Sequence, residues 1–249
     1  MLKSIILNTD TIIIWFYLNC GIILTGGFMK IFLIRHGESM QNTKENYESG
    51  LPDHMVYLTD QGKDDARKAG EFLKEYITTN NIDLTNSVMW VSPYKRTRET
   101  AEIINSILNI KKVKEDVTLI EQQYGLFSDK EISTIKEMYP DQFAFYDNYY
   151  QNDGKFYAKF PQGESPFDVA LRTKLFIDTI YRDKEDVLFV VTHGTTMKTI
   201  IMNFFHYSPE WYARELTPSN CSIRLIEADG KVNSERYIYN DPKQRNKIK

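Results

Sequence analysis

Short apolar runs alternate along the chain with segments of helical periodicity. Continuous short runs bounded by polar residues are typical of strands buried on both faces of a parallel sheet. Segments with apolar residues three and four positions apart are typical of helices that pack one side against a sheet. The predicted strands are 31–34, 88–91, 187–191, 222–226 and 232–239, and the predicted helices are 60–77, 164–181 and 197–205.

Local signals refine this pattern. Thr59 stands where the cap of the helix at 60–77 is expected. Ser92 and Pro93 predict a further helix start, with serine at the cap and proline in the first turn. The segment 129–150 is polar and rich in aromatic residues, which predicts a helical insertion over the functional site. Because strands and helices alternate, we expect an α/β fold with three αβα layers and a mostly parallel central sheet.

The sequence predicts one domain with a short segment on either side. The 249 residues fit one α/β domain, which we place at 29–240, followed by a polar tail at 241–249. The first 28 residues differ, because the run 11–24 is almost entirely apolar with Asn19 as its one clearly polar residue. This run is shorter than the ~20 apolar residues of a membrane span and nearer to a signal-peptide core, yet it lacks an A-x-A cleavage site.

Three interpretations of the apolar extension at residues 1–28 therefore stay open. A start at Met29 would make it a mis-assigned or non-functional extension, because Met29 leads directly into the first predicted strand. It could instead be an export signal or membrane anchor, or an additional packed element. We expect a cytoplasmic protein, with export or membrane contact only if residues 11–24 act as a signal or an anchor.

Overall charge argues against a nucleic-acid-binding protein. The formal net charge is −3, whereas nucleic-acid binding needs a basic face. Any anion site must therefore be a local concentration of arginine and histidine. Cys20 and Cys221 give neither a disulfide framework nor a metal-ligand spacing. We expect no metal, no cofactor and no nucleic-acid partner.

Two of the four histidines directly follow apolar runs. Arg35 and His36 end the first predicted strand, and His193 and Gly194 follow the run at 187–191. Because open α/β sheets bind ligands at the carboxyl edge of their strands, we expect one paired site. A neutral imidazole is a good nucleophile near pH 7, and a guanidinium can hold phosphoryl oxygens with two hydrogen bonds. The pattern predicts phosphoryl transfer with His36 as the nucleophile.

Two further residues complete the predicted site. Arg96 lies in the first turn of the helix predicted after Ser92, where it can bind the transferring group from a second side. Glu121 follows another apolar stretch and can protonate the leaving alcohol, then activate the attacking water. Each residue alone also fits an ordinary structural or solvated role, but their joint occurrence favours a site. His54 and His206 are assigned no catalytic role.

These motifs together resemble the histidine phosphatase superfamily, with its phosphoglycerate-mutase-like fold, over residues 29–227. The resemblance implies that His36 is phosphorylated, that Arg35 and Arg96 bind phosphate, that Glu121 is the proton donor and that His193 is the second catalytic histidine. It also implies that Asn42 helps to bind substrate phosphate. The residues themselves indicate that Gly194, after His193, lets the backbone come close to the phosphate. The matching segments are 35–39 (R-H-G-E-S), 58–62 (L-T-x-x-G), 92–97 (S-P-Y-K-R-T), 161–165 (P-Q-G-E-S) and 191–194 (V-T-H-G).

The sequence departs from the mutases of this family in two places. Their acidic residue is followed by arginine and histidine, within E-R-H-Y-G, whereas Glu121 is followed by Gln122 and Gln123. This change removes a fixed charge that a phosphoglycerate carboxylate or a second phosphate would use. Gln41 also stands where the mutases have tryptophan. Both departures favour the phosphatase branch.

We therefore predict a metal-independent phosphomonoester hydrolase, a histidine acid phosphatase or phosphoglycerate-mutase-like phosphatase, acting on a small-molecule phosphoester through phospho-His36. The nearest alternative is a bisphosphoglycerate-dependent phosphoglycerate mutase. A non-catalytic module that binds phosphorylated ligands on the same fold is a more distant one. The motifs leave the phosphoester and the oligomeric state open, and the aromatic residues of 143–160 fit either core packing or a large hydrophobic ester.

Overall fold

The computed structural model describes residues 29–43, 51–228 and 233–245, and the structural statements below refer to these ranges. The apolar run at 11–24 and Cys20 lie outside them. Within the described ranges, no helix combines the length and the apolar character that a membrane crossing requires.

A six-stranded sheet in the order β3-β2-β4-β1-β5-β6 forms the centre of the fold. β1 and β2 both pair in parallel with β4, and β2 also pairs in parallel with β3. β5 runs antiparallel to both β1 and β6. The strands are β1 (Met29–Arg35), β2 (Ser87–Val91), β3 (Val113–Glu115), β4 (Val187–Thr192), β5 (Ile223–Ala228) and β6 (Asn233–Tyr239).

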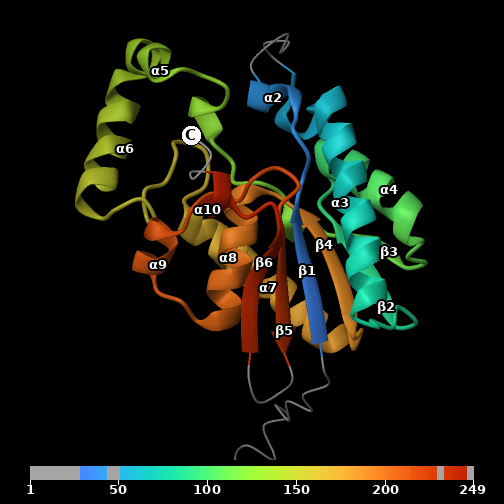
Figure 1. Cartoon of the computed structure of the whole chain (residues 1–249). Coiled ribbons are helices and arrows are strands. Elements are labelled where there is room, and N and C mark those ends of the chain that lie inside the picture. Colours follow the sequence, from blue (N-terminus) through green and yellow to red (C-terminus); the bar gives the residue numbers. More distant parts are fainter. Residues whose placement is uncertain (1–28, 44–50, 229–232, 246–249) are drawn as a thin grey trace, which may run out of the picture.

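Helices cover both faces of this sheet, α3 and α4 on one side and α7 and α8 on the other (Figure 1). The predicted α/β fold with three layers and a mostly parallel sheet is therefore confirmed. The α-helices are α2 (Met40–Thr43), α3 (Asp60–Thr79), α4 (Lys95–Leu108), α5 (Ile132–Met138), α6 (Pro140–Asn152), α7 (Pro166–Asp183), α8 (Gly194–Phe205), α9 (Pro209–Arg214) and α10 (Pro242–Arg245), and the 3-10 helices are η1 (Asp53–Met55), η2 (Val117–Leu119) and η3 (Gly125–Phe127).

The strand sequences explain the two cores. Successive side chains of a strand point to opposite faces. In β1, Ile31 and Leu33 therefore lie in the core beneath α7 and α8, whereas Phe32 and Ile34 lie beneath α3 and α4. All four are fully buried, as expected of a parallel strand in the middle of a sheet. β3 is not indicated by the apolar pattern, because Val113 is its one apolar residue.

Two predicted helix starts have different outcomes. Thr59 caps α3 as predicted, since its Oγ1 accepts a hydrogen bond from the Gly62 N–H at 2.9 Å. The prediction that Ser92 caps the next helix is wrong, because α4 begins at Lys95 and has no side-chain cap. The Ser92 hydroxyl instead lies 2.8 Å from Nε2 of His193, so it bonds to a residue of the predicted site and does not cap the helix.

The segment predicted as a helical insertion does form helices α5 and α6. In Figure 1 they stand to one side of the sheet, near the upper end where β1 and β4 finish. At the other end of the chain, the short helix α10 lies within the segment expected to be a polar tail.

The loop after β1 rests directly on the first turn of α3. A Cβ atom added to Gly62 would lie 2.0 Å from the carbonyl oxygen of Glu38, and one added to Gly37 would lie 2.5 Å from that of Gly62. The Thr59 N–H also donates to the Glu38 carbonyl at 3.0 Å. The loop that carries His36 is therefore held backbone against backbone, which explains why R-H-G-E-S and L-T-x-x-G occur together.

We expect Gly62→Ala to lower the free energy of unfolding by about 1–3 kcal/mol, because the added methyl group forces the loop away from α3. Urea unfolding followed by circular dichroism measures this change. Lys63→Ala, at an exposed position of the same helical turn, is the matched control and should change stability by less than about 0.5 kcal/mol. Equal stability of the two variants would contradict the close backbone contact.

Candidate active site

The two strand-end histidines meet at the carboxyl edge of the sheet. Arg35 ends β1 and is in register with Thr192 at the end of β4. His36 and His193 follow these residues, and their ring centroids lie 5.1 Å apart. Both side chains are buried, with 3% and 0% of their surface exposed. The structure thus brings together the pair that the two apolar runs indicate.

His36 is held at its backbone and its ring. Nδ1 lies 2.7 Å from the carbonyl oxygen of Gly37, so the ring hydrogen belongs on Nδ1 and Nε2 keeps its lone pair. The His36 N–H donates to the Thr192 carbonyl at 3.0 Å, and the Cys221 N–H donates to the His36 carbonyl at 3.2 Å. A fixed imidazole with an available Nε2 has the orientation that nucleophilic attack needs.

Burial and positive charge keep both imidazoles neutral near pH 7. Burial lowers the pKa of His36 well below its ordinary value, and the charges of Arg96 and then Arg35 lower this pKa further. For His193, burial again lowers the pKa most, followed by the charge of Arg96. Because a neutral imidazole is the nucleophilic form, these shifts extend the pH range of a histidine nucleophile to lower pH.

Arg96 is buried, and an acidic residue that the sequence analysis does not identify holds it. Its Nη1 donates to both the carbonyl oxygen and the carboxylate Oδ1 of Asp53, at 2.7 and 2.8 Å. The guanidinium also lies over the ring of Tyr94, 5.0 Å from its centroid. Asp53 belongs to η1 and follows a polar sequence without periodicity or motif, so no sequence signal links it to Arg96.

Arg35, Glu121 and Gly194 surround a common space. Arg35 donates from Nη1 to the carbonyl oxygen of Pro218 at 2.5 Å. A Cβ atom added to Gly194 would lie 3.7 Å from Arg35 Nε and 3.7 Å from Glu121 Oε2. Gly194 therefore borders the gap between the guanidinium and the carboxylate, where its missing side chain leaves room.

The Glu121 carboxylate lies at the N-terminal end of α8. Oε2 accepts a hydrogen bond from the Thr195 N–H at 3.3 Å, and Oε1 accepts one from the Gln122 N–H at 2.9 Å. These two backbone donors hold the carboxyl group of Glu121 in place. Burial and then the Glu121 charge raise the pKa values of the Tyr124 and Tyr212 phenols.

The Glu121 segment is fixed by the segment that opens α7. Cβ atoms added to Gly125 and Gly163 would lie 2.1 Å from Pro161 O and 2.3 Å from Gln123 O. The Glu164 N–H donates to Gln123 O at 2.7 Å. The motifs E-Q-x-x-G and P-Q-G-E-S are therefore one backbone-packed unit.

The two glutamines that distinguish this chain from the mutases are engaged by the protein. Gln122 is buried, and its Nε2 donates to the carbonyl oxygen of Glu164 at 2.8 Å. Gln123 donates from Nε2 to the Tyr94 hydroxyl at 2.6 Å. These side chains therefore pack the site without adding a positive charge.

One ring nitrogen of His193 has a hydrogen-bond partner among the described residues, and the other has none. Nε2 lies 2.8 Å from the hydroxyl of Ser92, whereas Nδ1 is buried and has no hydrogen-bond partner among the described residues. A buried nitrogen without a partner is costly, and a bound ligand oxygen would satisfy it. Ser92 belongs to the predicted S-P-Y-K-R-T motif, but its contact with His193 is missed because the motif also fits a helix cap.

The remaining predicted residues lie farther from the imidazoles or have structural contacts. Asn42 is exposed, and its Oδ1 accepts from the Ser39 N–H and from Asn220 Nδ2, both at 3.1 Å. Asn220 in turn donates to the His36 carbonyl at 3.3 Å. The role of Asn42 at a phosphate therefore stays a prediction. His206 ends α8 in the left-handed conformation, with a φ of 53°.

Within the described ranges, no three histidine, cysteine, aspartate or glutamate side chains are grouped so that they could hold a metal ion. Cys221 is a buried free thiol.

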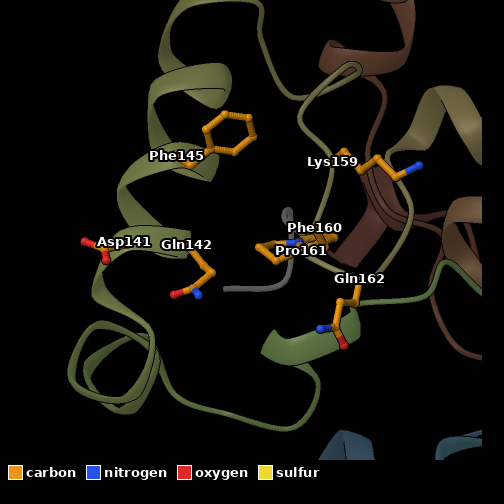
Figure 2. Close-up of a pocket in the computed structure, with 7 residues that line it drawn as sticks. All are labelled: Asp141, Gln142, Phe145, Lys159, Phe160, Pro161 and Gln162. Carbon is orange, nitrogen blue, oxygen red and sulfur yellow. The ribbon is translucent and has the colours of Figure 1, made fainter.

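A pocket of about 390 Å³ opens beside the site, between α6 and the segment that precedes α7 (Figure 2). Gln142 and Phe145 on α6 face Phe160 and Pro161 across the opening. The ring of Phe160 also lies 4.9 Å from that of Tyr124, so the pocket adjoins the Glu121 side of the site. Its lining residues are Asp141, Gln142, Phe145, Lys159, Phe160, Pro161 and Gln162.

A mostly parallel αβα fold with two buried histidines and two arginines at one sheet edge is the arrangement of the phosphoglycerate-mutase-like α/β proteins. The sequence model of the histidine phosphatase superfamily (branch 1) matches residues 31–241, and the chain belongs to this superfamily. The resemblance seen in the sequence motifs is therefore confirmed.

Relatives within the superfamily include phosphatases and mutase-like proteins. Phosphoglycerate mutase-like protein AT74 of Arabidopsis thaliana is 32% identical across 80% of this chain and 64% of that protein, so the chain spans less than two thirds of this relative. Broad-range acid phosphatase DET1 of Saccharomyces cerevisiae is 23% identical across 84% of this chain and 87% of that protein. The crystal structure of the alpha-ribazole phosphatase from Shigella flexneri shares the fold, with a TM-score of 0.67 and 19% identity over 84% of this chain and 95% of that one.

Proposed function

We propose that this protein is a metal-independent phosphomonoester hydrolase that acts on a small-molecule phosphoester through a phosphohistidine on His36. The observation that carries the proposal is the buried pair of His36 and His193, in which Nε2 of His36 keeps its lone pair and the charges of Arg96 and Arg35 are near enough to lower the His36 pKa. These groups supply a nucleophile and the positive charge that a transferring phosphoryl group needs.

In the first step, Nε2 of His36 attacks phosphorus while the ester P–O bond breaks. Arg35 and Arg96 balance the charge on the phosphoryl oxygens. With Nε2 of His193 accepting a hydrogen bond from the Ser92 hydroxyl, the neutral ring carries its hydrogen on Nδ1, and this N–H donates a hydrogen bond to a phosphoryl oxygen. Glu121, entering as the carboxylic acid, gives its proton to the leaving alkoxide.

After the first step, Glu121 is a carboxylate, and in the second step it acts as the base. Its carboxylate takes a proton from water as the water oxygen attacks phosphorus. The P–N bond to His36 then breaks, inorganic phosphate leaves and Glu121 is again protonated. The lowered pKa of His36 keeps the nucleophile neutral below the usual histidine range, which supports assignment as an acid phosphatase.

Phosphatase rather than mutase chemistry is supported by the residues after Glu121. Gln122 and Gln123 bond to protein groups and add no charge that would retain a carboxylate or a second phosphate. A mutase must keep its intermediate bound until the phosphoryl group returns, so it needs such a charge.

We expect the protein to release inorganic phosphate from at least one member of a panel of sugar phosphates, nucleotides, phosphopeptides and p-nitrophenyl phosphate, with EDTA present. A colorimetric phosphate assay measures the release, and ³¹P NMR follows 3-phosphoglycerate in parallel. Conversion of 3-phosphoglycerate to 2-phosphoglycerate without free phosphate would establish the mutase instead. Ligand binding with no turnover of any ester would establish the non-catalytic module.

A further inference from the structure

The phosphate-binding arginine Arg96 is paired with a carboxylate that the proposed reaction does not use. Asp53 Oδ1 lies 2.8 Å from Arg96 Nη1, and the side chain of Arg96 is 3% exposed while that of Asp53 is 22% exposed. The contacts of Asp53 with Arg96 use its Oδ1 and its backbone oxygen, and within the described ranges Oδ2 makes no hydrogen bond. One oxygen of this partly exposed carboxylate is therefore bound to the arginine, and the other is available to a ligand.

Neighbouring phenols show which side of the site Asp53 faces. Burial and then the Asp53 charge raise the pKa of Tyr94, whose ring centroid is 5.1 Å from that of His193. The charges of Glu121 and Asp53 both contribute to the raised pKa of Tyr124, after burial. The contacts agree with this, because Arg96, the partner of Asp53, lies over the Tyr94 ring, and Gln123 donates to the Tyr94 hydroxyl at 2.6 Å. Asp53 therefore lies toward the Glu121 segment, where the leaving group would be protonated.

Among the described residues, one carboxylate lies beside the two site arginines when the ester enters. Asp53 pairs with Arg96, Glu121 enters as the carboxylic acid, and both imidazoles are neutral. Arg172, the next arginine whose charge reaches His193, is itself bound to Glu164 at 2.9 Å. A phosphoryl group can use the two site arginines, but a second anion on the leaving group would meet the Asp53 carboxylate.

We propose that Asp53 is a specificity-determining residue that selects esters with uncharged, hydroxyl-bearing leaving groups over esters whose leaving group carries an anion. Oδ2 accepts a hydrogen bond from a leaving-group hydroxyl, and the same oxygen repels a carboxylate or a second phosphate. This inference rests on the proposed phosphatase function. Two independent features then disfavour phosphoglycerates: the Asp53 carboxylate repels their second anion, and no arginine follows Glu121 to bind it.

The test compares glycerol 3-phosphate with 3-phosphoglycerate, which share a three-carbon skeleton and differ by a hydroxymethyl group in place of a carboxylate. We expect wild type to prefer glycerol 3-phosphate in kcat/KM by about tenfold or more, because like charges interact strongly at this range. Asp53→Asn should reduce this preference by about tenfold, mainly through a lower KM for 3-phosphoglycerate. Asp178→Asn removes the same charge from a half-exposed side chain near the far end of α7 and should leave the preference unchanged.

An equal change of kcat/KM for both esters in Asp53→Asn would show that Asp53 only positions Arg96, and would overturn the proposal. Calorimetric binding of the same two esters to His36→Ala and to His36→Ala/Asp53→Asn measures selectivity without turnover. A wild type that hydrolyses no ester would refute the proposed function, while these binding constants would still decide the role of Asp53. Thermal unfolding of each variant shows that the comparison is made on folded protein.

Discussion

Replacing His36 by alanine is expected to lower kcat for phosphomonoester hydrolysis by ~10⁴-fold or more while the protein stays folded. The imidazole forms the only bond to phosphorus in the proposed first step, and no second nucleophile is needed by the mechanism. His36 lies in a loop that is held by its backbone, through hydrogen bonds to Thr192 and Cys221, so the fold does not depend on the ring. Steady-state phosphate release and circular dichroism measure the two effects.

His206→Asn is the matched control for this variant. His206 is exposed at the end of α8 in a left-handed conformation that asparagine tolerates, so its replacement should leave kcat within about twofold of wild type. Substantial turnover by folded His36→Ala protein would refute His36 as the nucleophile.

Replacing Glu121 by glutamine is expected to have an effect that depends on the leaving group. For alkyl phosphates, whose alkoxide must be protonated, kcat should fall by ~10²–10⁴-fold, the usual contribution of general acid catalysis. For p-nitrophenyl phosphate, whose leaving group departs without a proton, the bond-breaking step should slow by less than about tenfold. Glutamine keeps an oxygen that can accept from the Thr195 N–H, so the segment should stay in place.

Stopped-flow detection of p-nitrophenol and steady-state assays of an alkyl phosphate separate these outcomes. Glu102→Gln, an exposed position on α4, is the control for loss of one carboxylate. If Glu121→Gln slows bond breaking equally for both esters, Glu121 positions the substrate and does not act as the acid.

The sequence predicts the fold and the centre of the site because both depend on local patterns. The apolar runs at 31–34 and 187–191 form most of β1 and β4. Continuous apolar runs are typical of strands that are buried on both faces of a sheet. Since each run ends in a histidine, parallel pairing of β1 with β4 is enough to bring His36 and His193 together. Arg35 and Gly194 follow from the same register.

Contacts between segments that are distant in sequence could not be predicted in this way. Asp53 in η1 contacts Arg96 across 43 positions, and the sequence before Asp53 has no periodicity. The Ser92 hydroxyl bonds to His193 across 101 positions, although its local sequence fits a helix cap equally well. The glycine motifs are visible in the sequence. Only the structure shows which backbone segments pack against each other at these glycines, for example Gly37 against Gly62.

These distant contacts also change the functional interpretation. From the sequence alone, the predicted site contains two arginines, two histidines and Glu121. The structure adds Asp53 as the partner of Arg96, and burial lowers the pKa of both histidines, so the site carries less positive charge than two arginines and two histidines could supply. This arrangement supports our proposal of an ester with a single phosphoryl group over the multiply charged ligands of a mutase.

The central claim is that the phosphoryl group passes through His36, and mass spectrometry of quenched enzyme tests it most directly. In Glu121→Gln with p-nitrophenyl phosphate, the first step needs no acid but the second step lacks its base, so the phosphoenzyme should accumulate. The account predicts one added phosphoryl group per chain, labile to acid and located on His36 by peptide sequencing. An unmodified protein during turnover, or a phosphoryl group on His193 or any other residue, would contradict it.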